Sequence, residues 1–125
     1  MTNEQLEFYL NRDNLFGFNT DNNEDVVGWI ILSKRFPNLR FFEIVKEWEA
    51  PEKYKAQMKI KEEPYLVWIA QMKRENFESD KFPCEDDYLL NTSYSFKTLE
   101  DVDGFLKEMG YELSGIKWAA DVDFL

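Results

Sequence analysis

The sequence of 125 residues contains no histidine and only one cysteine, Cys84. Histidine is the commonest general base and the commonest nitrogen ligand for transition metals, so its absence excludes Ser-His-Asp and Cys-His hydrolases. One cysteine forms neither an internal disulfide bond nor a thiolate zinc cage. The five glycines form no phosphate-cradling loop. We therefore expect a protein that is not an enzyme and that binds neither a cofactor nor a metal.

Long hydrophobic runs are also missing. No apolar run approaches the about 18 residues of a membrane span, and the N-terminal MTNEQLEFYLNRDN has acids and amides where a signal peptide needs a basic start. A single cysteine fits a reducing compartment. The hydrophobic fraction of 44% and the aromatic fraction of 17% argue against disorder. These features predict one cytoplasmic domain that does not bind membranes.

Acidic residues are abundant and unevenly distributed. The net charge is −10, with −5 in residues 1–25, +4 in residues 26–74 and −9 in residues 75–125. The electrostatic field of this net negative charge repels phosphate groups, so nucleic acids and anionic membranes are poor partners. A uniformly acidic surface that serves only solubility is the plain alternative to a segregated binding surface.

The stretch from Leu39 to Met72 is interpreted as three consecutive β-strands that form the scaffold. The first runs from about Leu39 to Trp48, and the middle strand is indicated by apolar residues that alternate with polar ones over residues 53–61. Pro51 and Pro64 mark the turns. The third strand, Tyr65 to Met72, is apolar on both faces, which is typical of a central strand.

Helices are predicted on both sides of this scaffold. Thr2 and Gln5 have the spacing of a capping box, which predicts a helix to about Asn11. Asp25 to Phe36 has the end signals of a helix, which we favour, but its β-branched residues also fit a buried strand. Thr98 begins an amphipathic helix that ends at Gly110. Its apolar stripe is Leu99, Val102, Phe105, Leu106 and Met109.

Shorter elements complete the predicted chain. Leu15 to Phe18 forms a small strand or a packed turn, residues 73–92 are mostly loop, and Tyr94 to Lys97 forms a fourth strand. A last strand and tail cover Ile116 to Leu125, with Trp118 as the anchor. This order predicts a single α+β domain over residues 1–125, with a mainly antiparallel sheet and helices packed on a face.

The candidate site is the densest run of acids, Glu85, Asp86 and Asp87. It lacks the DxDxDG spacing of a calcium loop, which leaves a solvated loop or a binding surface as the stronger interpretations. Phe82 and Tyr88 border the run, and aromatic anchors ringed by charge are typical of protein interfaces.

Two further groups of charged residues stand out. Asp21, Glu24 and Asp25 form a second candidate acidic patch. The lysines at 53, 55, 59 and 61 suggest a nucleic-acid contact, but no exposed aromatic residues are interleaved with them, which disfavours it.

The chain is small and acidic, and it contains segments such as NTSYSFKTLEDVDGFLKEMGY (Asn91 to Tyr111). In these features it resembles bacterial immunity proteins, the inhibitors encoded beside contact-dependent or other polymorphic toxins. The resemblance implies stoichiometric binding to a cognate toxin, often a basic nuclease. A phage or plasmid inhibitor that imitates DNA against a restriction or CRISPR nuclease is the alternative, and an enzyme using carboxylates and a divalent metal is a second one. The oligomeric state is left open.

Overall fold

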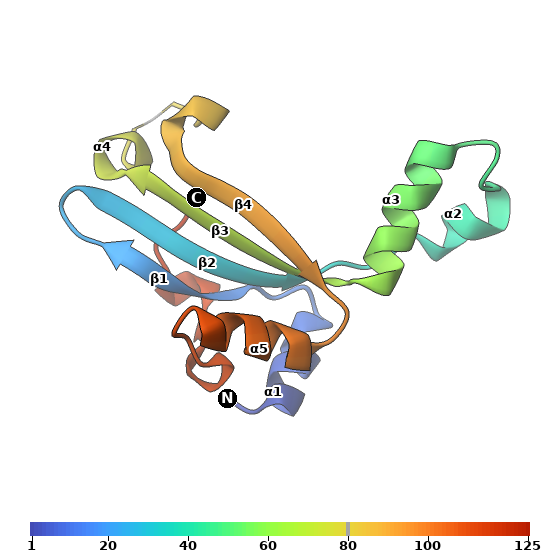
Figure 1. Cartoon of the computed structure of the whole chain (residues 1–125), viewed down its shortest axis with the longest axis horizontal. Coiled ribbons are helices and arrows are strands. Elements are labelled where there is room, and N and C mark those ends of the chain that lie inside the picture. The colour runs from blue at the N-terminus through green and yellow to red at the C-terminus, as the bar shows by residue number, and fades with distance from the viewer. Residues whose placement is uncertain (80) are drawn as a thin grey trace.

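Figure 1 shows the computed structural model, which describes residues 1–79 and 81–125. Its strands form one antiparallel sheet in the order β4-β3-β2-β1-β5. The strands are β1 (Phe16–Asn22), β2 (Val26–Lys34), β3 (Tyr65–Lys73), β4 (Tyr88–Phe96) and β5 (Lys117–Trp118). The helices are α1 (Asn3–Leu10), α2 (Leu39–Ile44), α3 (Pro51–Glu62), α4 (Arg74–Phe77) and α5 (Leu99–Glu108), with 3₁₀ turns η1 (Glu85–Asp87), η2 (Leu113–Gly115) and η3 (Ala119–Asp121). The predicted single α+β domain is confirmed.

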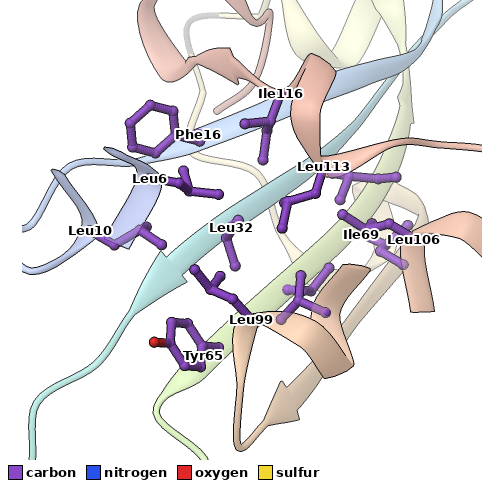
Figure 2. Packing of buried hydrophobic residues seen from close by; sticks show 13 residues of the cluster. Leu6, Leu10, Phe16, Leu32, Tyr65, Ile69, Leu99, Leu106, Leu113 and Ile116 are labelled. Atoms are coloured by element: carbon purple, nitrogen blue, oxygen red, sulfur yellow. The ribbon is translucent and has the colours of Figure 1, made fainter. Parts of the chain in front are cut away.

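Helices α1 and α5 pack on one face of the sheet and enclose the main core (Figure 2). Both predicted helix starts are confirmed, because Thr2 and Gln5 form a capping box and the Thr98 hydroxyl accepts from the backbone N–H of Asp101 at 3.1 Å. Gly110 has a φ of +91°, as expected for a left-handed helix end. The core residues from helices, strands and the η2 region are Leu6, Leu10, Phe16, Ile30, Leu32, Tyr65, Val67, Ile69, Leu99, Val102, Leu106, Leu113 and Ile116.

Residues Asp25 to Phe36 do not form the helix that we favoured. Val26–Lys34 is strand β2, and it pairs along its whole length with β3. Residues 27–32 are all buried, because β2 lies between β1 and β3 and has a hydrophobic cluster on each face. A continuous β-branched run suits such a position better than a one-sided helix. The strand interpretation of this segment is therefore the correct one.

The opposite face of the sheet carries a second, smaller cluster. Trp29 is its largest fully buried residue, and Trp68 packs edge-on against it with ring centroids 5.4 Å apart. Val122 near the C-terminus and Phe77 of α4 cover part of this face. The prediction that β3 is apolar and covered on both faces is confirmed.

The predicted scaffold of three strands over Leu39 to Met72 is wrong in its first two members. Residues 39–44 form α2, which begins at the N-cap Asn38, and residues 51–62 form α3, with Pro51 in its first turn. Alanine, lysine, glutamine, glutamate and methionine are strong helix formers, and proline is favoured at the first helical position. Local propensity therefore outweighs the alternation of residues 53–61.

Helices α2 and α3, residues 39–62, form an arm that projects from one end of the sheet (Figure 1). None of the residues of this arm is buried. The two helices are joined by the Gln57 side chain, whose oxygen accepts from the backbone N–H of Asn38 at 2.7 Å. The ring of Phe42 packs edge-on against the ring of Tyr54, with ring centroids 5.3 Å apart. At the base, the backbone N–H of Arg35 donates to the carbonyl of Pro64 at 2.8 Å. The arm is therefore an appendage of the sheet, not its scaffold.

The remaining predictions are correct in part. Of the two alternatives for Leu15 to Phe18, a small strand or a packed turn, the strand is correct: β1 begins at Phe16 and extends to Asn22. The predicted loop over residues 73–92 contains α4, η1 and the beginning of β4, while residue 80 lies outside the described residues. The predicted fourth strand is confirmed but begins earlier, at Tyr88. The last strand is shorter than expected, at Lys117–Trp118. No helix in the described part of the chain is long and apolar enough to cross a membrane.

Candidate functional site

The two predicted acidic patches belong to segments at the same end of the sheet, opposite the arm. The β1–β2 turn carries Glu24 and Asp25, and the connection from β3 to β4 carries η1, so the antiparallel topology places both at the end of the sheet away from the arm (Figure 1). A shallow hollow of about 330 Å³ at this end is lined by Glu24, Asp25 and Glu75, by the cation Lys73, and by Val26 and Leu89. We call Glu24, Asp25, Glu75, Glu85, Asp86 and Asp87 the acidic end.

Arg74 holds the β1–β2 turn against the start of α4. Its backbone N–H donates to the carbonyl of Asp25 at 2.9 Å, and its guanidinium donates to the carbonyl of Asn23 and the side chain of Asn22. Asn23 in turn accepts from the backbone N–H groups of Asp25 and Val26 at 2.9 Å. These bonds fix the backbone that presents Glu24 and Asp25, and both of these residues are exposed.

The η1 turn divides the three acids of the run into two roles. Asp87 is half-buried, and its carboxylate accepts from the backbone N–H of Cys84 at 2.7 Å, which closes the turn. Glu85 and Asp86 are exposed. Asp87 therefore shapes the turn, while Glu85 and Asp86 are the carboxylates that it displays.

The two predicted aromatic anchors differ in how firmly they are held. Phe82 is 96% exposed, whereas Tyr88 is partly buried with its ring 6.4 Å from that of Trp29. Burial, and then the nearby Asp87 carboxylate, raise the pKa of Tyr88 above its ordinary value, so its hydroxyl stays neutral. The two residues line a groove of about 450 Å³ together with Lys81, Pro83 and Leu125. The groove has a mostly apolar lining, and Lys81 contributes a positive charge to it.

Asp21 belongs to the sheet and not to the displayed acids. It is half-buried on β1, and its carboxylate accepts from the Gln71 side chain and from the Thr20 hydroxyl. These side chains crowd over Gly28, where an added Cβ would lie 2.4 Å from the Thr20 oxygen. The structure thus places Glu24 and Asp25 at the same end of the sheet as the η1 acids, but it engages Asp21 in internal hydrogen bonds.

Within residues 1–79 and 81–125, no group of three or more cysteine, aspartate and glutamate side chains is arranged to hold a metal ion. Lys73, Arg74 and Lys81 are placed among the acids at this end of the sheet. The chemistry that the site offers is display of carboxylates beside an apolar groove, which suits a cationic protein surface.

The arm is the feature that the sequence interpretation missed. Trp48 is 76% exposed there, and Leu39 and Ile44 are also exposed. The arm carries five acids and six bases, while the rest of the chain carries twenty acids and nine bases. Asn38 and Pro51 were the available signals, since asparagine is favoured at the N-cap and proline at the first helical position. The charge is therefore divided between an acidic body and a nearly balanced arm.

No protein-family model, curated protein or solved structure matches this chain.

Proposed function

We propose that this protein is an immunity protein that binds a cognate bacterial toxin, a basic nuclease domain, and neutralises it by stoichiometric contact. The observation that supports this function best is that two acidic segments, far apart in sequence, lie at the same end of the sheet, and that exposed Phe82 precedes one of them. Because the fold determines where these carboxylates lie, the acidic end suits binding to a partner with a matching arrangement of cationic side chains.

The proposed inhibition follows from charge and burial. A nuclease binds phosphate groups through cationic side chains, and Glu24, Asp25, Glu85 and Asp86 present carboxylates to the same positions. Opposite charges raise association rates to about 10⁸–10⁹ M⁻¹s⁻¹ at low salt. Affinity then comes from a few desolvated anchors, and Phe82 and Tyr88 fill that role.

The test uses the nuclease toxin domain that the proposal expects to be encoded beside this gene. We expect the purified chain to abolish its nuclease activity at a molar ratio of one to one, and co-expression to restore growth of cells that produce the toxin. Inhibition that requires a large excess, or growth that is not restored, would refute the function.

The site is tested separately with a pair of charge-matched variants. Glu85→Lys with Asp86→Lys reverses two displayed acids, and Glu43→Lys with Glu47→Lys makes the same change in the arm. We expect the first variant to slow association by about tenfold or more at low salt, because steering depends on local charge. The arm variant should associate nearly as fast as the parent chain. Equal rates for both variants would remove the acidic end as the binding site while leaving the function intact.

A further inference from the structure

Strand β4 is an open sheet edge without the usual protection. It is the terminal strand of the sheet, and in the part of the chain that the structure describes no strand pairs with its outer side. Its nine residues, YLLNTSYSF, include neither a charged residue nor a proline. Natural edge strands are normally blocked by charges, proline, bulges or short length, because an open edge pairs with another strand. The one bulge of β4 lies near its start, between Tyr88 and Leu90, and leaves the rest regular.

The sequence of this edge is complementary to itself in the antiparallel direction. A two-fold axis at Thr92 places Leu90 opposite Tyr94 of a second copy, and Asn91 opposite Ser93. Leu90 is 41% exposed and Tyr94 is 44% exposed, and they share one face of β4 with Thr92. Two apolar pairs would therefore flank a Thr–Thr pair, and both kinds of cross-strand pair are stabilising.

The flanks of β4 have opposite charges, which selects the antiparallel direction. Asp87 and the other η1 acids precede the strand, and Lys97 follows it. With the axis at Thr92 and the bulge at Leu89, Lys97 of one copy lies one position beyond Asp87 of the other, so the two opposite charges are neighbours. A parallel arrangement would instead place the η1 acids of two copies side by side, which is unfavourable in a chain of net charge −10.

We propose that β4 pairs antiparallel with β4 of a second copy, about a two-fold axis at Thr92. The two sheets then continue as one across the pair, and the isologous contact closes on itself without building a filament. The proposal goes beyond toxin inhibition and does not depend on it.

The first test measures mass against concentration. Sedimentation equilibrium from about 5 µM to about 500 µM should show a reversible rise from 15.0 kDa toward twice that mass. Leu90→Lys should lower the association constant by about tenfold or more, since the contact contains this residue twice. Leu89→Lys is the matched control, because Leu89 is 54% exposed at the bulge and outside the regular pairing. A monomer at every concentration, or equal losses in both variants, would overturn the proposal.

The second test determines the register with engineered cysteines. In a chain with Cys84→Ser, Thr92→Cys places two thiols opposite each other on the axis, within the Cα separation that a disulfide needs. Mild oxidation should therefore link Thr92→Cys into a covalent dimer. Ser93→Cys lies on the other face and opposite Asn91, so it should link far more slowly. A faster reaction at position 93 than at position 92 would contradict the proposed register.

Discussion

At the scale of single residues, Glu7 joins the first helix to the ends of two strands. Its carboxylate accepts from the hydroxyl of Tyr65 at the start of β3 and from the ammonium of Lys34 at the end of β2. Lys34 also donates to the side chain of Asn11 at 2.7 Å. Burial, and then the hydrogen bond and charge of Glu7, raise the pKa of Tyr65 well above its ordinary value. The folded state therefore favours the neutral phenol.

We predict that Tyr65→Phe lowers the free energy of unfolding by about 1–2 kcal/mol near pH 8, because a hydrogen bond to a charged acceptor is lost. The stabilisation by Tyr65 is fully present below about pH 10, the ordinary phenol pKa, and declines as the pH rises toward the raised folded-state pKa. The difference between the parent chain and the variant should therefore shrink between about pH 10 and 11. Urea unfolding at several pH values measures it, and a constant difference would contradict the role of the phenol.

Some of the side-chain contacts could be predicted from the sequence, and others could not. The caps at Thr2 and Thr98 were predictable because each partner lies three residues along the same chain segment. Glu7 and Tyr65 are 58 residues apart, and nothing in local spacing pairs them. Contacts of this kind depend on the register of β3 against β2, which only the folded chain defines.

At the scale of elements, the errors have a common cause. The alternation over residues 53–61 satisfies the pattern of a strand, but Tyr54, Gln57 and Met58, which are half-buried, recur at helical spacing. The run Val26 to Leu32 satisfies both patterns, because it is apolar at almost every position. Periodicity is ambiguous in both segments, and composition would have been the better guide: helix formers in the first and β-branched residues in the second.

We predict that the arm can be removed without unfolding the sheet. In the variant, an Asn-Gly turn between Arg35 and Pro64 replaces residues 36–63, none of which is buried, and the backbones of Arg35 and Pro64 already share a hydrogen bond of 2.8 Å. The free energy of unfolding should change by less than about 1 kcal/mol, since none of the arm residues is buried and the loop becomes shorter. Thermal and urea unfolding measure this change.

Leu106→Ala is the control for the arm deletion. Leu106 is fully buried on α5, so this small substitution should cost about 2–5 kcal/mol, more than deletion of the whole arm. A shortened chain that is unfolded, or destabilised as much as Leu106→Ala, would show that the arm supports the core.

At the scale of the whole molecule, the fold gathers charge that the sequence scatters. Glu24 and Asp25 precede Glu85 and Asp86 by about sixty positions, yet antiparallel pairing places both at the same sheet end. The sequence could identify each run as acidic, but their placement at the same end of the sheet follows from strand direction. The basic middle block of the sequence contains the arm, but the arm supplies only +1 of the block's +4, and the other +3 comes from residues 26–38 and 63–74.

The division of charge between the acidic body and the nearly balanced arm predicts how stability depends on salt. At about 10 mM salt the Debye length is about 30 Å, so the acids of the body repel one another across most of the molecule, whereas at 1 M it is about 3 Å. Glu85→Lys with Asp86→Lys should therefore raise the free energy of unfolding by about 0.5–1 kcal/mol at low salt, and this gain should vanish at high salt. Glu43→Lys with Glu47→Lys should give a smaller gain, because lysines and Arg40 already balance the acids of the arm. Urea unfolding measures the free energy of unfolding of the parent chain and of both variants at each salt concentration. Because each variant is compared with the parent at the same salt concentration, the effect of salt on the hydrophobic core cancels. Equal gains from the two variants would mean that only net charge matters, and that the acidic end does not concentrate repulsion.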